Sequence, residues 1–370
     1  MTPIAKNALL VIAACAVSIG ATAQNSAQPR KPKPAAAPAA APLFYASRSD
    51  AMALADDIAA RRNLDREWVR QAIGQARLLP QVPKLMLPAP GGATAKNWRV
   101  YRSRFVEPIR IRAGVRFWQE NAAALARAEQ EYGVPAEVIV GIIGVETIYG
   151  QQMGGFRVMD ALATLSFDFP DAHPRAADRR AFFRGELEQF LSLMDRTGTD
   201  PFTPRGSYAG AMGLGQFMPS SWVRYAVDYD GDGRIDLWKS PTDAIGSVAH
   251  YFKGHDWQTG MPVWYDVQFD PGRLQLPALL ALLALLALLA PDILPTFTAA
   301  RMAELGATPL GAGAAHAGPL ALVELQNGGE TPTYVIGTEN FYAITRYNWS
   351  SYYAMAVNAL GREVAVARGR

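Results

Sequence analysis

A single carboxylate at the end of an apolar run is the residue of this chain best suited to acid–base chemistry. Glu146 follows eight apolar or glycine residues, 138–145, and precedes the segment 147–150. Burial penalises the charged form of a carboxyl group and so raises its pKa. A carboxyl group that stays protonated near neutral pH is what general acid catalysis requires. We therefore predict that Glu146 is a catalytic acid.

The segment 206–222 is the second candidate for ligand contact. It places four glycines within the ten positions 206–215, and a predicted helix follows at Pro219. Glycine lets the backbone approach a ligand closely, and the Gln216 side chain offers both an amide donor and an acceptor. Such a loop is suited to a sugar ligand. The segment lacks the Gly-Lys-Ser/Thr ending of a phosphate loop, so it does not indicate a nucleotide site.

The segment 228–243 predicts a calcium site. Carboxylates alternate along it and a glycine stands at its sixth position, as at the start of an EF-hand loop. Alternation turns successive oxygen ligands toward one point, here those of Asp228, Asp230 and Asp232. The twelfth position is Lys239 where a bidentate Glu belongs, and Asp243 could supply that ligand from a lengthened loop. The alternative is an acidic turn that caps the next helix, 244–252.

The composition is that of a globular protein without thiol chemistry in its folded part. The 370 residues are 50% hydrophobic and 19% charged, which is enough to bury a sizeable core. The formal net charge of +3 is too small to indicate a nucleic-acid partner, although it is compatible with a polyanionic wall or lipid head groups. Because the one cysteine, Cys15, lies in the N-terminal apolar segment, the folded body has no disulfide, Cys-based metal site or Cys nucleophile.

Residues 1–23 predict export from the cytoplasm. Lys6 supplies a positive start, a short apolar stretch follows, and a small-x-small cleavage site ends at position 23. The residues before Cys15 also resemble a lipobox, in which case the signal ends before Cys15 and a lipid attaches the protein to the outer membrane. Either route leads to the periplasm. The Pro/Ala-rich segment 24–42 predicts a linker.

Helix signals dominate the segment 43–262. Asp65 is placed to cap one helix, and Pro135 at a first helical position opens the helix that ends in Glu146. A further amphipathic helix covers 178–194. At its start Arg179 and Arg180 oppose the helix dipole, which indicates an anionic or carbonyl-bearing ligand; a solvated surface is the alternative.

Strand signals appear nearer the C-terminus. Short alternating pieces bounded by Gly, Pro or Asn in 263–337 predict a small sheet. Between them, 278–290 is a Leu-Leu-Ala repeat that is helical by propensity and too short to span a bilayer. The closing segment, 338–370, predicts helices and carries tyrosines beside Asn348 that are able to stack on sugar rings or to pack in the core.

Four motifs in the same order resemble the membrane-bound lytic murein transglycosylase B family: the helix ending in Glu146, 210–221, 228–249 and 340–348. The likeness extends from about residue 43 to the C-terminus. It implies a mainly α member of the α+β class. It also implies a lysozyme-like helical core with an N-terminal helical domain in 43–262, a small inserted β domain in 263–337, and a return of 338–370 to the core.

The resemblance also implies roles for individual residues. Glu146 matches the catalytic acid and base. Residues that match contacts to the glycan and its peptide are Arg179, Arg180, Ser207, Gln216, Tyr251, Tyr347, Asn348 and Tyr353. The implied calcium ligands are Asp228, Asp230, Asp232, the carbonyl of Arg234, and Asp243. One extra residue before Asp243 and the Leu-Leu-Ala repeat depart from the family pattern.

The implied partner is peptidoglycan and the implied reaction needs one carboxylate. Glycosidases that use water normally place two carboxylates across the scissile bond, and no second one accompanies Glu146 in the motif segments. Asp160, Asp168 and Asp171 lie downstream in a Phe- and Pro-rich stretch without a helix-facing pattern. A lytic transglycosylase closes a 1,6-anhydro ring on N-acetylmuramic acid instead. A hydrolytic muramidase and a non-catalytic wall-binding module remain the alternatives.

Overall fold

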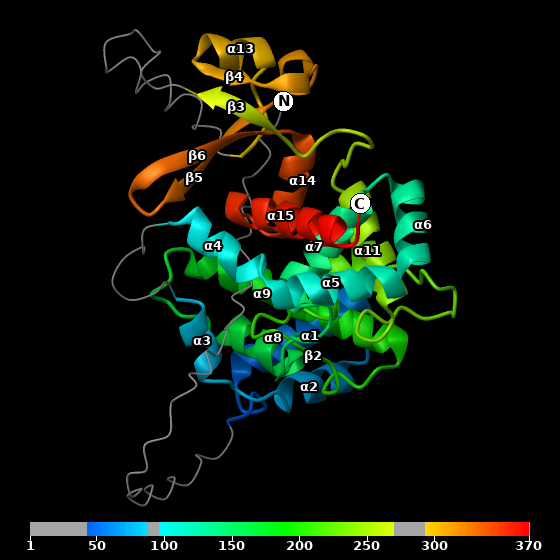
Figure 1. Cartoon of the computed structure of the whole chain (residues 1–370). Helices are drawn as coiled ribbons and strands as arrows, with labels where there is room; N and C mark the ends of the chain where they lie inside the picture. Colours follow the sequence, from blue (N-terminus) through cyan, green and yellow to red (C-terminus); the bar gives the residue numbers. More distant parts are fainter. Residues whose placement is uncertain (1–42, 88–95, 270–292, 370) are drawn as a thin grey trace, which may run out of the picture.

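The fold is seen in a computed structural model of the chain, which describes residues 43–87, 96–269 and 293–369 (Figure 1). Three predictions concern residues outside this part: the signal segment 1–23 with Cys15, the linker 24–42, and the repeat 278–290. Within the described part, no helix combines the length and the apolar character that crossing a bilayer requires.

Helices make up most of the described chain, which confirms the mainly α member of the α+β class. Those that precede the sheet are α1 (Ser49–Arg62), α2 (Arg66–Gly74), α3 (Gln81–Leu85), α4 (Trp98–Phe105), α5 (Pro108–Glu120), α6 (Ala122–Tyr132), α7 (Ala136–Thr147), α8 (Val158–Phe167), α9 (Ala176–Thr197), α10 (Pro219–Tyr225) and α11 (Pro241–Lys253). Those that follow β3 are α13 (Ala299–Glu304), the 3₁₀ turn η1 (Gly311–Ala315), α14 (Glu339–Tyr347) and α15 (Ser351–Ala367).

Helix starts follow the capping residues with one correction. The Asp65 side chain accepts a hydrogen bond from the backbone N–H of Trp68, as predicted. Helix α7 begins one residue later than predicted, because Pro135 has an extended ψ of 137° and serves as the N-cap. Helix α10 receives its cap from another element: Glu186 in α9 accepts hydrogen bonds from the backbone N–H and the hydroxyl of Ser220.

The strands form two antiparallel sheets. Short β1 (Phe156–Arg157) and β2 (Arg205–Gly206) make one, and the other has the order β4-β3-β6-β5, with β3 (Trp264–Phe269), β4 (Ala307–Pro309), β5 (Ala321–Asn327) and β6 (Glu330–Gly337). Gly328 and Gly329 make the turn of the β5–β6 hairpin, both at positive φ. In Figure 1 the larger sheet and α13 lie at one end of the molecule, α1 and α2 at the other, and α15 between them.

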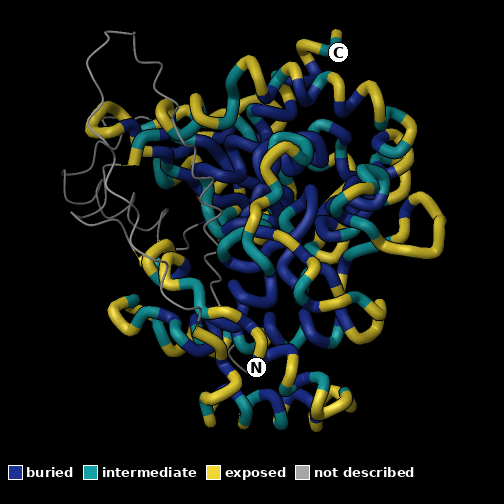
Figure 2. The backbone as a smooth tube through the Cα atoms, turned by 90° about the horizontal axis from the view of Figure 1, so that it is seen from below, coloured by how far each residue is buried: buried dark blue, intermediate teal, exposed yellow. Residues whose placement is uncertain are grey.

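Helix α7 runs through the centre of the main core. Eleven of its twelve residues are buried, all but Glu137, as expected for a helix that is apolar around almost its whole circumference. Figure 2 shows buried segments gathered in the interior of the molecule and exposed ones at its periphery. Its close partner is α15, and glycines set their spacing. A Cβ at Gly141 would lie 2.3 Å from the Val357 carbonyl oxygen, and one at Gly361 would lie 2.1 Å from that of Glu137. The two backbones therefore approach more closely than larger residues would allow.

Candidate active site

Glu146 lies in the last turn of α7 and is 5% exposed. The hydroxyl of Tyr353, from α15, donates a hydrogen bond of 2.5 Å to its Oε1. Burial raises the pKa of Glu146 to about 7, while the Tyr353 hydrogen bond favours the charged form and opposes that rise. The sequence prediction of a buried carboxyl group with a raised pKa is therefore confirmed. Such a group is able both to donate and to accept a proton near neutral pH.

Two stacked tyrosines stand beside this carboxyl group. The rings of Tyr347 and Tyr353 lie 6.4 Å apart between centroids with planes inclined by 14°. The Tyr347 hydroxyl donates to the carbonyl oxygen of Gly215 in the glycine-rich segment. Burial, followed by the charge of Glu146, raises the pKa of both phenols well above the usual value. Both therefore remain protonated hydrogen-bond donors throughout the physiological pH range.

The end of α7 is joined directly to the glycine-rich segment. The Thr147 hydroxyl donates a hydrogen bond of 2.9 Å to the carbonyl oxygen of Leu214. Directly after it, Ile148 and Tyr149 both have positive φ, at 51° and 54°, which turns the chain sharply away. For a β-branched residue such as Ile148 this conformation is strained, and strain of this kind persists only where its surroundings enforce it.

The glycine-rich segment is shaped by contacts of its own. Gln216 also has a positive φ, and its side-chain amide nitrogen donates to the carbonyl oxygens of Gly213 and Met153, at 2.9 and 3.2 Å. A Cβ at Gly213 would lie 2.5 Å from the Leu237 carbonyl oxygen, so this glycine is required for close packing. The Ser207 hydroxyl oxygen accepts backbone N–H groups within the turn. Both side chains therefore stabilise the loop.

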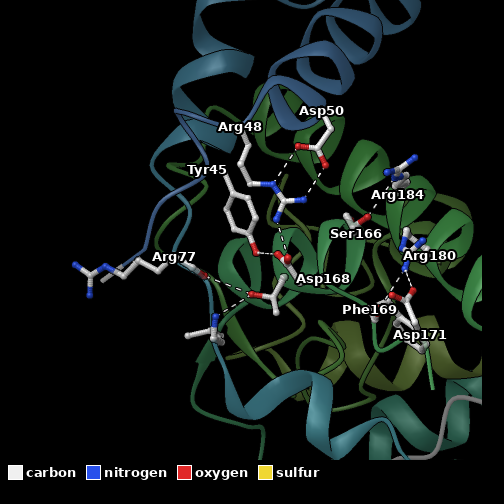
Figure 3. A network of polar contacts seen from close by, with 12 residues as sticks. Tyr45, Arg48, Asp50, Arg77, Ser166, Asp168, Phe169, Asp171, Arg180 and Arg184 are labelled. Carbon is white, nitrogen blue, oxygen red and sulfur yellow. Dashed lines mark hydrogen bonds and ion pairs between the residues drawn. The ribbon is translucent and has the colours of Figure 1, made fainter. Parts of the chain in front are cut away.

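The structure separates the two arginines that the sequence paired. Arg179 is 7% exposed, so a solvated surface is wrong for it, and the Tyr208 phenol lies near enough to affect its pKa, which burial lowers. Arg180 points elsewhere: its Nη2 donates to the Asp171 carboxylate at 2.6 Å and to the Phe169 carbonyl at 3.2 Å (Figure 3). Because adjacent positions on a helix point about 100° apart, the two side chains face different surroundings.

The remaining predicted residues surround Tyr347. The Tyr251 ring lies 4.8 Å from that of Tyr347, and its hydroxyl donates to the Arg346 carbonyl at 2.8 Å. Burial raises the pKa of Tyr251. Asn348, 9% exposed, directly follows α14. These contacts orient the end of α14 and with it the Tyr347 hydroxyl.

One residue near the site was missed from the sequence. The Tyr101 phenol, on α4, lies near enough to Tyr353 to raise the pKa of that phenol, although burial and Glu146 act more strongly. Its ring also packs against those of Phe105 and Tyr352. The mixture of aromatic residues and arginines in 98–107 was the available signal, but nothing in it distinguished Tyr101 from its aromatic neighbours.

The three downstream carboxylates all have partners away from Glu146. Asp160 accepts from the Arg157 guanidinium and the Arg77 backbone N–H. Asp168 accepts from the Tyr45 hydroxyl and the Arg48 guanidinium, and Asp171 pairs with Arg180 (Figure 3). These partners tie α8 and the loop after it to the N-terminal residues and to α9.

The predicted metal loop brings three carboxylates together. Asp228, Asp230 and Asp232 each offer an oxygen within 4.8 Å of the others, and all three are exposed. Like charges held this close repel one another, and an all-oxygen donor set suits a hard cation such as Ca²⁺. The residues therefore fit calcium.

Asp243 has a different environment. It is 1% exposed and accepts backbone N–H groups from the loop, at Oδ1 from Tyr229 and Asp230 and at Oδ2 from Asp236. Its carboxylate thus stabilises the loop conformation through these hydrogen bonds. Because Oδ1 already accepts two hydrogen bonds, Oδ2 is the oxygen with capacity left for a cation.

Comparison with known proteins places the chain among wall-degrading enzymes. The sequence profile described as "Transglycosylase SLT domain" matches residues 46–362. The chain is 42% identical over 334 residues to the membrane-bound lytic murein transglycosylase B of Escherichia coli K12, covering 88% of this chain and 85% of that protein.

Similarity to solved structures supports the same family assignment. The Escherichia coli lytic transglycosylase SLT35 in complex with calcium has a TM-score of 0.74 at 41% identity, covering 88% of this chain and 96% of that one. SltB3 from Pseudomonas aeruginosa, in complex with NAG-anhNAM-pentapeptide, has a TM-score of 0.65 at 27% identity, covering 83% of this chain and 77% of that one.

Proposed function

The chain belongs to the transglycosylase SLT domain family and is a peptidoglycan lytic transglycosylase, and from the geometry of its site we propose that Glu146 alone supplies both proton transfers. The observation that carries this proposal is the burial of Glu146 with a pKa near 7 against the Tyr353 hydroxyl. Near neutral pH, such a group exists in both protonation states.

The reaction begins with Glu146 as an acid. Its proton passes to the glycosidic oxygen between N-acetylmuramic acid and N-acetylglucosamine, and the bond from that oxygen to C1 breaks. The acetamido group of the muramoyl residue stabilises the electron-poor C1. Glu146, now a carboxylate, is stabilised by the Tyr353 hydroxyl, which donates to Oε1.

The second step uses Glu146 as a base. It removes the proton of the C6 hydroxyl of the same muramoyl residue, and that oxygen bonds to C1 and closes the 1,6-anhydro ring. Glu146 ends protonated, as it began, and no water is consumed. An internal nucleophile held in position outcompetes water because its effective concentration is high.

The environment of the three acidic groups downstream of Glu146 supports a single catalytic carboxylate. A hydrolytic muramidase needs a second carboxylate across the scissile bond to activate or replace water. Asp160, Asp168 and Asp171, the downstream candidates, are engaged by Arg157, Tyr45 with Arg48, and Arg180 respectively. We therefore favour transglycosylation over hydrolysis at this site.

Substrate contacts follow from the same surroundings. We propose that the glycan and its peptide are held by Arg179, Arg180, Ser207, Gln216, Tyr251, Tyr347, Asn348 and Tyr353, with Tyr101 added. Because Ser207 and Gln216 already shape their loop, their role toward the sugar includes presenting backbone groups of that loop. Tyr251 acts through Tyr347, since its own hydroxyl is committed to the Arg346 carbonyl.

We further propose that Asp228, Asp230, Asp232, the Arg234 carbonyl and Asp243 hold a structural Ca²⁺. When bound, the ion would neutralise the clustered carboxylates and order the loop before α11.

The protein is exported to the periplasm, and a lipid on Cys15 would attach it to the outer membrane. Its core comprises 43–262 and 338–370, with 263–337 as an inserted β domain.

Mass spectrometry of the products released from purified peptidoglycan tests the proposal. Transglycosylation gives anhydromuropeptides with the mass of the parent repeat, whereas hydrolysis gives products heavier by one water. Glu146→Gln should abolish release while sedimentation with insoluble peptidoglycan persists. Release by this variant at the wild-type rate, or hydrated products from the wild type, would falsify the proposal.

A further inference from the structure

Arg110 is a buried cation that lies against the helix of the catalytic carboxyl group. It stands in the first turn of α5 and is 3% exposed. Taking a guanidinium out of water is costly unless hydrogen bonds and opposite charges compensate. Its position near the start of α5 adds to this cost, because a cation there opposes the helix dipole. The groups around Arg110 must therefore offset the cost of its burial.

Backbone carbonyls, a carboxylate and an aromatic ring surround the guanidinium. Nε donates to the Gly144 carbonyl oxygen at 2.9 Å, and Nη1 donates to the Arg104 carbonyl oxygen at 2.7 Å. The Glu107 carboxylate lies 3.8 Å from Nη1, and the centre of the Phe105 ring lies 5.3 Å from the guanidinium carbon. Nη1 thus serves the corner between α4 and α5, whereas Nε reaches α7.

The Gly144 carbonyl belongs to the last turn of α7, which also carries Glu146. Carbonyls at the end of a helix lack ordinary intrahelical partners and need other donors. The backbone N–H of Ile148 also donates to the Gly144 oxygen, at the longer distance of 3.2 Å. A cation at this end of α7 is favoured by the helix dipole. The Nε contact therefore fixes the turn from which the Glu146 side chain projects.

The strained turn that follows Glu146 lies close to the same guanidinium. After the positive φ angles of Ile148 and Tyr149, the Tyr149 phenol packs between α5 and α7. A Cβ at Gly114 would lie 2.5 Å from the phenol oxygen. Burial raises the pKa of Tyr149, and the charge of Arg110 opposes that rise. Arg110 thus holds the residue before the strained turn and lies near the aromatic side chain within it.

We propose that Arg110 is a positioning residue of the transglycosylation reaction. Its Nε holds the Gly144 carbonyl and thereby keeps the last turn of α7 in the orientation that brings Glu146 to Tyr353 and to the glycosidic oxygen. This role rests on the proposed function, in which Glu146 transfers both protons. Arg110 itself contacts α7 rather than the substrate, so its loss should affect turnover and not substrate binding.

Isosteric variants test the Nε donor. Arg110→Met puts a methyl group, and Arg110→Gln an amide nitrogen, as many bonds from Cα as Nε is. With soluble peptidoglycan strands, Arg110→Met should lower kcat about tenfold to a hundredfold, because small displacements of a catalytic group are costly. Its KM should stay within about threefold, and Arg110→Gln should keep both constants within about threefold. Arg112→Met, at an exposed position of the same helix, should change neither constant.

A third variant keeps the test valid if Arg110→Met fails to fold. Arg110→Lys retains a cation with flexible donors but has a methylene group where Nε stands. It should lose kcat as Arg110→Met does, since the charge is not what holds the Gly144 carbonyl. Urea unfolding verifies that each variant is folded at the assay temperature. Equal losses in the Met and Gln variants, an unchanged kcat in both the Met and Lys variants, or a higher KM at constant kcat would overturn the proposal.

A double variant distinguishes positioning of Glu146 from a structural effect elsewhere. Tyr353→Phe and Arg110→Met both loosen the same carboxyl group, so together they should lower kcat by less than the product of their separate effects. A full product would show that Arg110 acts elsewhere. Release by Glu146→Gln at the wild-type rate would refute the catalytic assignment. If Glu146→Gln is inactive and the Met and Gln variants of Arg110 behave alike, only the role of Arg110 is refuted.

Discussion

The contact between Tyr353 and Glu146 makes the pH dependence of the reaction predictable. Tyr353→Phe removes the hydroxyl that lies 2.5 Å from Oε1 and keeps the ring that stacks on Tyr347. That hydroxyl favours the charged carboxylate, so its loss should raise the pKa of Glu146 above the present value of about 7.

The size of the shift follows from the strength of the contact. A hydrogen bond to a charged acceptor contributes about 1.5–3 kcal/mol, and each pKa unit corresponds to about 1.4 kcal/mol. The upper limit is therefore about two units. The phenol also donates to the protonated carboxyl group, so its loss changes the free-energy difference between the two protonation states by only part of this amount. We therefore expect the pKa of Glu146 to rise by about one unit.

The assay is the rate of anhydromuropeptide release at saturating peptidoglycan as a function of pH. Cleavage starts from protonated Glu146, so the wild-type rate should fall as the pH rises through about 7. In Tyr353→Phe this fall should move about one unit higher, with a lower maximum because the carboxyl group loses its orienting donor.

A neighbouring tyrosine provides the control. The Tyr352 hydroxyl donates to the Gln326 carbonyl oxygen, so Tyr352→Phe removes a hydroxyl from the same helix without touching Glu146. Its profile should match the wild type. If the pH at which the release rate of Tyr353→Phe falls is unchanged or lower, then the Tyr353 hydroxyl does not lower the pKa of Glu146 and this interpretation of the contact is wrong.

Three further predictions concern stability and helix spacing. Because the pKa of Glu146 is raised from 4.5 to about 7, the free energy of unfolding of the wild type should fall by about 3 kcal/mol as the pH rises from 4 through 7. Urea unfolding of Glu146→Gln should show no such fall. An equal fall in the variant would refute the prediction. Gly361→Ala should push α15 away from α7, lower kcat at least tenfold and lower the free energy of unfolding by about 1–3 kcal/mol. Gly185→Ala is the control, since an added Cβ there meets no atom within 4 Å, and it should lower neither kcat nor stability. Chelation of Ca²⁺ should lower the Tm by several degrees, and Asp230→Asn, unlike Asp195→Asn, should remove that response; an unchanged Tm would exclude the metal.

Local patterns in the sequence determined much of the fold and the centre of the site. Helical periodicity and the Asp65 cap located helices, and short alternating segments located the strands β3, β5 and β6. The environment of Glu146 was predictable because a run of apolar residues on every face of one helix can only be buried. The clustered carboxylates of 228–232 were predictable for a similar reason, since their spacing is set within one loop.

Tertiary structure decided which distant side chains meet. Tyr353 is 207 residues from Glu146 and reaches it only because glycines let α15 lie close against α7. Arg179 and Arg180 are neighbours in sequence, yet packing buries one near Tyr208 and directs the other to Asp171. Sequence periodicity encodes which face of an element is apolar, whereas the partner of each polar side chain depends on how whole elements pack. That packing is a property of the entire chain.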